Sequence, residues 1–179
     1  DCLRNGFYED GISILTLVLI NDAWQPDVVE RLAEAYRAIG DSDKSKERFK
    51  EVVKYYFDRG EYPKAVEVQT EILNLDTRDY NERVLLADLY VAGKSANKAA
   101  EEYRTALKSI NSKNEPDLFI EVSGKLIKTV KSDIRVREEL VETLLRINRK
   151  EVALAHLSEL AVLHSSQGNY KAAIDIYHR

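Results

Sequence analysis

The sequence has little of what marks several large classes of protein. It contains one Cys, no Met, 3 Pro and 7 Gly. A single Cys excludes an internal disulfide and a Cys-based zinc site. The longest apolar stretch covers 12–20 and is interrupted by Ser13 and Thr16, whereas a membrane-spanning helix needs about 20 residues. We therefore expect no membrane span, and the scarcity of turn formers favours long helices.

The charge balance limits the kinds of partner that the chain is expected to bind. The 179 residues carry a formal net charge of -4, with 44% hydrophobic and 32% charged residues. This composition is not that of a disordered chain, and its good helix formers predict an all-α fold. The acidic balance argues against nucleic acid as a partner. Because the chain opens on Asp1 and lacks Met, we expect a piece of a longer protein, and we expect a cytoplasmic location.

An internal repeat organises the chain. The same residue types recur at a constant spacing along the chain, as in Leu32, Leu86 and Leu140. We call the interval from Leu32 to Leu86 one repeat length. The predicted domain covers 1–179, and its successive repeat units are a truncated first unit at 7–20, then 21–75, 76–130 and 131–179. Because repeats of this length bury their apolar faces by stacking on neighbours, the register predicts an α-solenoid.

Each unit is predicted to contain three antiparallel helices, since the connections are short. The apolar spacing places the first at 27–39, 81–92 and 134–147, the second at 42–58, 96–111 and 150–166, and the third at 61–75, 115–130 and from 169, with 7–20 as an incomplete copy. The first helices are predicted to stop at Gly40, Gly93 and Asn148, residues that tolerate a left-handed backbone. Ala33, Ala65 and Ala87 are expected at helix crossings, where only a small side chain fits.

Three segments carry a resemblance to a known family: LAEAYRAIGD from Leu32, GEYPKAVEVQTEILNLD from Gly60 and GNYKAAIDIY from Gly168. They resemble helices and turns of the tetratricopeptide repeat, and the spacing of Ala65 and Ala99 matches the period of that family. The resemblance implies a right-handed α-solenoid of antiparallel helices that binds proteins and is not an enzyme. The chain departs from the family because its unit is longer and has three helices. Because each unit has an odd number of antiparallel helices, equivalent helices of successive units point in opposite directions. The same orientation is therefore expected to recur only after two repeat lengths.

The sequence offers little for catalysis. His156, His164 and His178 lack the spacing of a metal site, and Cys2 has no nearby His. Cys2 aligns with apolar positions and is expected to be a small buried residue. Gly-rich phosphate loops and the common hydrolase and metalloprotease motifs are absent from the sequence. We predict no enzymatic activity, no metal and no cofactor.

Two features have a structural and a functional interpretation. Trp24 either anchors an interface or covers the end of a helix pair. A basic cluster either contacts RNA or forms a solvated helix face among neighbouring acids, the interpretation we favour; it consists of Lys125, Lys128, Lys131, Arg135 and Arg137.

An acidic strip is the most informative polar pattern. Glu34, Asp88 and Glu142 follow one another at one repeat length, at a position that faces the concave surface in the family that the chain resembles. We predict a partner-binding surface made of Glu30, Glu34, Arg37, Asp88, Glu138 and Glu142. Its expected partner is a basic or amphipathic protein segment. The alternative is that these carboxylates are simply solvated.

The predicted function is a non-catalytic protein-interaction scaffold, and the alternative is a structural spacer within a larger repeat protein. The N-terminal helix differs from its repeats, because Leu15 and Leu17 align with polar residues. A helix that is apolar nearly all round needs cover. We therefore predict an apolar patch at Leu15 and Leu17 through which the chain forms homo-oligomers.

Overall fold

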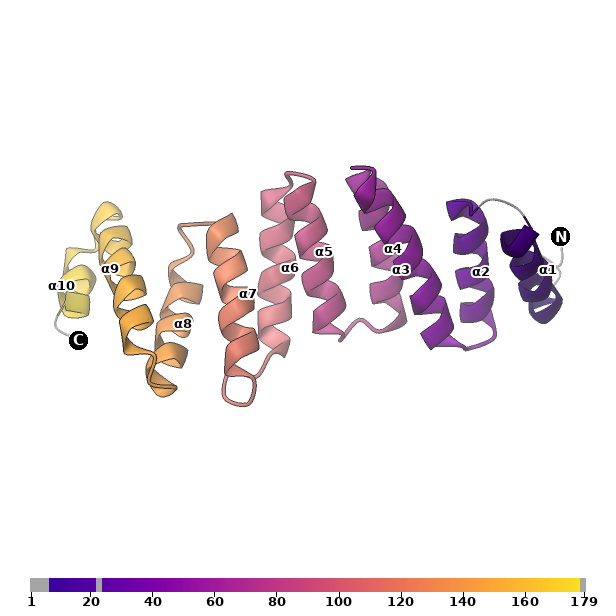
Figure 1. Cartoon of the computed structure of the whole chain (residues 1–179). Coiled ribbons are helices and arrows are strands. Elements are labelled where there is room, and N and C mark those ends of the chain that lie inside the picture. Colours follow the sequence, from indigo (N-terminus) through magenta and orange to yellow (C-terminus); the bar gives the residue numbers. More distant parts are fainter. Residues whose placement is uncertain (1–6, 22–23, 178–179) are drawn as a thin grey trace. The chain divides into compact units, whose positions relative to one another are not determined.

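The structure, a computed structural model, describes residues 7–21 and 24–177. Within these residues the chain is all-α, with ten helices and no strand (Figure 1). The helices are α1 (Tyr8–Asn21), α2 (Pro26–Ala38), α3 (Ser42–Asp58), α4 (Tyr62–Leu75), α5 (Tyr80–Ala92), α6 (Ala96–Ser109), α7 (Pro116–Thr129), α8 (Ile134–Arg146), α9 (Lys150–Ser166) and α10 (Tyr170–Tyr177). The predicted helices are confirmed, with small shifts at some of the described ends. Cys2 and His178 lie outside the described residues.

Local sequence explains where the helices begin. The Asp41 carboxylate accepts a hydrogen bond from the backbone N–H of Lys44, and Asp79 and Asp133 cap α5 and α8 in the same way. Such caps satisfy backbone donors that have no partner inside the helix. Pro26, Pro63 and Pro116 lie in the first turns of α2, α4 and α7, where a missing N–H costs nothing.

The ends of the first helices correct one prediction. Gly40 and Asn148 have φ values of +82° and +63°, as expected of residues that end a helix in a left-handed conformation. In the middle repeat the left-handed residue is Lys94 (φ +58°), and Gly93 has an ordinary φ of −78°. A different feature favours glycine at position 93, because a Cβ there would lie 3.3 Å from the Cβ of Tyr62, a tight contact.

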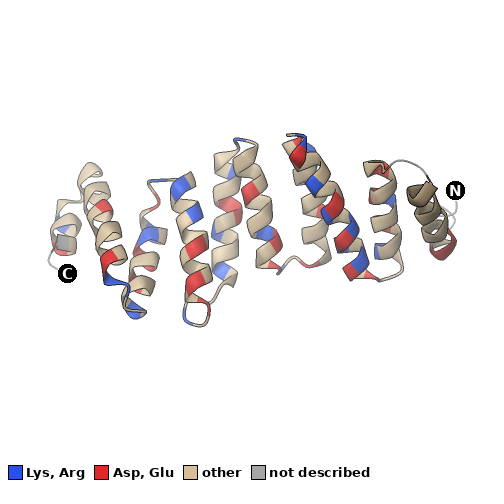
Figure 2. Ribbon diagram, in the orientation of Figure 1, with Lys and Arg blue, Asp and Glu red and all other residues tan. Residues whose placement is uncertain are grey.

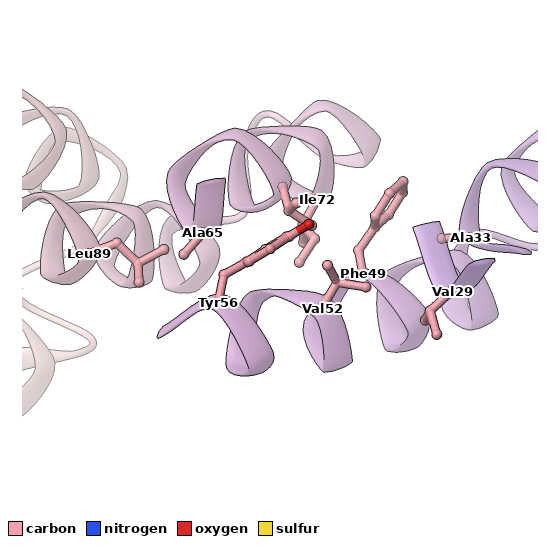
Figure 3. Packing of buried hydrophobic residues seen from close by; sticks show 9 residues of the cluster. Val29, Ala33, Phe49, Val52, Tyr56, Ala65, Ile72 and Leu89 are labelled. Atoms are coloured by element: carbon pink, nitrogen blue, oxygen red, sulfur yellow. The ribbon is translucent and has the colours of Figure 1, made fainter. Parts of the chain in front are cut away.

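The chain divides into two compact units, 1–94 and 95–179. In the first, consecutive helices from α1 to α5 pack against one another. Figure 3 shows its core, where the ring of Tyr56 lies beside Ile72 between α3 and α4. Ala33, Ala65 and Ala87 are all completely buried, so these alanines occupy tight positions as predicted.

In the second unit consecutive helices from α6 to α10 also pack together. Val141 of α8 packs with Leu157 and Leu160 of α9, and Ile176 of α10 covers this cluster. Ala99 and Ala153 are completely buried at the position that Ser45 occupies in the first unit. The repeat register therefore matches equivalent packing positions in the two units.

Ion pairs also join alternate helices in the first unit. Arg37 of α2 pairs with Glu71 of α4 at 2.6 Å. Lys46 and Lys50 of α3 reach the buried Glu82 of α5 at 3.0 and 2.7 Å, and Figure 2 shows basic and acidic segments alternating along α3. Helices α2 and α4 thus form one layer of this unit, and α3 and α5 form the other.

The second unit has the same arrangement. Arg104 of α6 pairs with Asp133, the N-cap of α8, at 2.7 Å, and Arg149 at the start of α9 pairs with Asp117 of α7 at 2.9 Å. Asp79, one repeat length before Asp133, is likewise the N-cap of a first helix and pairs with Lys46 of the preceding second helix at 2.8 Å. These contacts give the two-layered, antiparallel packing of an α-solenoid within each unit.

The N-terminal helix α1 keeps an apolar surface. Leu17 and Ile20 have exposed fractions of 58% and 72%, and Ile14 is exposed too, while Leu15 is half-buried. The charged residues of α1 are confined to its first turn, and the rest of the helix is tan in Figure 2. None of the described helices is long and apolar enough to span a bilayer.

Candidate functional site

The first candidate site is an acidic group between α2 and α4 of the first unit. It consists of Glu30 and Glu34 on α2 and Glu67 on α4, and we call it the first acidic site. Tyr56, a buried residue of α3, lies near the Glu30 carboxylate. Among the described residues, none of the three carboxylates forms an ion pair with a basic side chain.

The charges of this site repel one another. Partial burial raises the pKa of the Glu30 carboxyl above its ordinary value, and the nearby Asp27, Glu34 and Glu67 raise it further. The neighbouring Tyr56 lowers this pKa without cancelling the other effects. A half-buried carboxylate with several acidic neighbours and no cation is favourable for a positively charged ligand.

The second candidate site is a cavity of about 330 Å³ between α8, α9 and α10 of the second unit. Glu138 and Glu142 of α8 and Asp175 of α10 line it, and we call these three residues the second acidic site. Val141, Leu157, Leu160 and Ile176 supply apolar lining. His164 of α9 lies with its Nε2 3.6 Å from a Glu138 carboxylate oxygen.

The two acidic sites are copies of one another in sequence. Glu30, Glu34 and Glu67 precede Glu138, Glu142 and Asp175 by two repeat lengths each. Tyr56 and His164 are related by the same shift, and each places a polar side-chain atom next to the first Glu of its site. The phase of two repeat lengths expected of an odd number of helices therefore brings the same chemistry together twice.

The structure separates the predicted partner-binding residues into groups. Glu30 and Glu34 share the first acidic site, and Glu138 and Glu142 share the second. Arg37 is paired with Glu71, at the end of the same α2–α4 layer. Asp88 lies on α5, whose ion pairs go to α3, so its helix belongs to the other layer of the first unit. We do not include Asp88 in the first acidic site, and its role in binding stays a prediction.

The predicted partner-binding residues do not include Glu67 and Asp175. A register of one repeat length aligns both of them with Glu121, so the acidic recurrence at this position is visible in the sequence. The relation of Tyr56 to His164 appears only at two repeat lengths, because Ile110 lies between them in the register.

The other singled-out residues lie away from these sites. Trp24 packs on Tyr55 of α3, with ring centroids 4.7 Å apart, and is partly exposed. His156 lies 3.1 Å from the guanidinium of Arg137. Among the described residues no group of three His, Cys, Asp or Glu side chains has the geometry of a metal site.

Comparison with known proteins places the fold. A sequence profile described as tetratricopeptide repeat matches residues 27–56, which form α2 and most of α3. Residues 27–56 therefore resemble one tetratricopeptide repeat, and the described helices have the antiparallel packing of an all-α solenoid within each unit. No curated protein matches the sequence.

Several solved structures have distant similarity. MamA from Desulfovibrio magneticus RS-1 is 18% identical, with 93% of this chain and 90% of that chain covered and a TM-score of 0.30. The yeast Sti1 TPR2AB domain, solved in a complex with an HSP90 peptide, is 15% identical, with 99% and 79% covered and a TM-score of 0.30. BtubC from P. vanneervenii is 13% identical, with 94% and 85% covered and a TM-score of 0.42. These similarities carry no argument about partners of this chain.

The repeat supports a general role as a protein-interaction scaffold. Stacked helical repeats present extended surfaces, and binding is their usual use.

Proposed function

We propose that the chain is a scaffold that binds basic or amphipathic protein segments at the first and second acidic sites. The observation that carries the proposal is the recurrence of the same three acidic positions after two repeat lengths, each time between a first helix and a third helix. A spacer needs stacked apolar faces and has no need for grouped carboxylates, among which burial and acidic neighbours raise the pKa of Glu30.

The chemistry of each site suits a Lys or Arg side chain. Three carboxylates can accept charge-assisted hydrogen bonds from one ammonium or guanidinium group. In the second acidic site the apolar lining lies beside the carboxylates, so an apolar side chain next to the basic one also finds a contact. In the first acidic site Lys64 stays close by but is paired with Glu61 at 2.7 Å, which leaves the three carboxylates to a ligand.

The experiment is titration calorimetry with a blocked peptide rich in Lys and Leu, at low and high salt. We expect two binding events per chain, and a loss of one event in either Glu34→Lys or Glu142→Lys. Each reversal should weaken binding at its own site by about tenfold or more, because an attraction becomes a repulsion.

The matched controls are Glu47→Lys on α3 and Glu101→Lys on α6, which are exposed and change the net charge equally. They should leave both binding events in place. Equal losses in these controls would show that only the net charge matters. Asp88→Asn adds a second comparison: a loss of binding there would support the predicted strip of Glu34, Asp88 and Glu142 over the two sites.

A further inference from the structure

A second kind of pocket lies in the unit 95–179, on residues that the acidic sites do not use. A cavity of about 550 Å³ is bounded by the end of α7, the start of α8 and the middle of α9. Its basic lining residues are Lys128, Lys131 and Arg137, and its acidic one is Glu159. Three members of the basic cluster noted in the sequence thus line one cavity.

Arg137 is the centre of this pocket. It is only 3% exposed, yet its Nε has no hydrogen-bond partner among the described residues. Its Nη atoms donate to the Glu159 carboxylate and to the backbone oxygen of Lys131. A guanidinium has five N–H donors, and a buried donor without an acceptor is unfavourable. The Nε itself is buried, so an acceptor from outside the chain would meet the guanidinium on the Nη side, where the exposed Glu159 carboxylate lies.

The surroundings of Arg137 are electropositive. Lys128 and Lys131 are exposed, and neither ammonium forms an ion pair with a described side chain. Burial and the positive charge of Arg137 lower the pKa of the neighbouring His156, against the opposing effect of Glu159. Glu159 is the acid that faces Arg137, and its side chain is 60% exposed.

The basic residues are not required by the repeat. Arg83, which precedes Arg137 by one repeat length, also donates to a loop carbonyl, that of Thr77. Both arginines thus have the structural role of donating a hydrogen bond to the loop that precedes their helix. Lys128 and Lys131, however, correspond to Asn74 and Thr77, so the two lysines are additions to this unit.

We propose that this pocket binds a protein segment in which an acidic side chain is flanked by an apolar one. Glu159 shows that a carboxylate fits against the Arg137 guanidinium, and a ligand carboxylate would replace it there. Ile127, Val162 and Leu163 provide the apolar contact. None of the lining residues is aromatic, whereas single-stranded nucleic acids are usually bound by stacking on aromatic rings.

The test uses a blocked peptide of alternating Asp and Leu, with the full chain, and measures its affinity by calorimetry. Lys128→Gln with Lys131→Gln should weaken binding by about tenfold, because two cations are lost from the pocket. The control pair Lys113→Gln with Lys150→Gln removes the same charge from exposed positions of the same unit and should change the affinity by less than about twofold. Equal weakening in the control pair overturns the proposal.

A variant that binds the peptide more tightly than the wild type distinguishes a direct effect on binding from a loss of folding. Glu159→Gln removes the internal competitor for Arg137 and should tighten the Asp and Leu peptide by about threefold or more. The same peptide with Asn in place of Asp should not bind, and its binding would overturn the acidic specificity. A single-stranded oligonucleotide that binds more tightly than the peptide, and loses affinity in the Lys128→Gln, Lys131→Gln variant, would overturn the proposal and assign the pocket to phosphate.

Discussion

Glu30 is a residue at which ligand binding and stability oppose each other. Burial and the acidic neighbours raise the pKa of its carboxyl, so the folded state holds the proton more tightly than the unfolded state. Its contribution to the free energy of unfolding is therefore unfavourable at neutral pH. Stability falls as pH rises from the ordinary pKa through the raised one.

Glu30→Gln removes this penalty and should raise the melting temperature at pH 7 by about 1–3 °C. The gain should vanish as pH falls below about 4, where the carboxyl is protonated in both states. Thermal melts across this pH range measure it, with the exposed Glu47→Gln as the control. A lower melting temperature at pH 7 would contradict the repulsion that we infer.

Glu82 is the opposite case within the same unit. It is 3% exposed and is held by Lys50, Lys46 and the Gln69 amide at 2.7, 3.0 and 2.9 Å. Burial alone would raise the pKa of its carboxyl, but these hydrogen bonds outweigh burial and lower it. The stabilisation is thus present above the ordinary pKa and is lost as pH falls through the lowered one.

Glu82→Gln should lower the free energy of unfolding by about 1–3 kcal/mol at pH 7, since Lys50 loses its partner and Lys46 keeps only Asp79. Urea denaturation measures the change. Glu47→Gln, an exposed change in the same unit, should stay within about 0.5 kcal/mol of the wild type. If the two variants were equally stable, the ion pairs between α3 and α5 would contribute nothing.

At the scale of the helices, packing depends on a few small residues. Ala87 of α5 is completely buried, as are Ala33 of α2 and Ala65 of α4. Ala87→Leu should overpack the interior and destabilise the protein by about 1–3 kcal/mol. Ala38→Leu adds the same side chain at an exposed position of α2 and should have little effect. An unchanged melting temperature in Ala87→Leu would contradict this packing.

At the end of α5, close packing and helix termination are provided by two neighbouring residues. The approach of Tyr62 requires a small residue at 93, and the helix termination requires a left-handed residue at 94. Gly93 meets the first and Lys94 meets the second. The pattern of turn residues located the helix end correctly, but it could not tell which of the two residues carries the positive φ.

At the scale of the whole molecule, the apolar surface of α1 predicts self-association. Leu17, Ile14 and Ile20 are exposed, and such a patch favours association with a second copy. Leu15→Gln with Leu17→Glu should return the protein to monomer without unfolding it. Light scattering over a range of concentrations measures the state, and Thr16→Glu on the same helix controls for the added charge. A wild-type monomer at high concentration would contradict the prediction.

The helices and their order were determined by the sequence alone. Apolar periodicity, acidic caps, early prolines and turn glycines act within a few residues, so their effect can be read locally. The repeat register also identified Ala33, Ala65 and Ala87 as buried, because equivalent repeats make equivalent contacts. The acidic pattern of Glu30, Glu34, Glu138 and Glu142 is also visible in the sequence alone.

Only the tertiary structure decided which charges meet. The side of a solenoid on which a residue lies depends on the layer to which its helix belongs. Successive helices alternate between the two layers, so residues that are one repeat length apart in the sequence lie in different layers. Glu67 and Asp175 join the two acidic sites for this reason, whereas Asp88 belongs to a helix of the other layer. The burial of Arg137, in a basic cluster that otherwise resembles a solvated helix face, was decided in the same way, by the packing of α8 against α7 and α9.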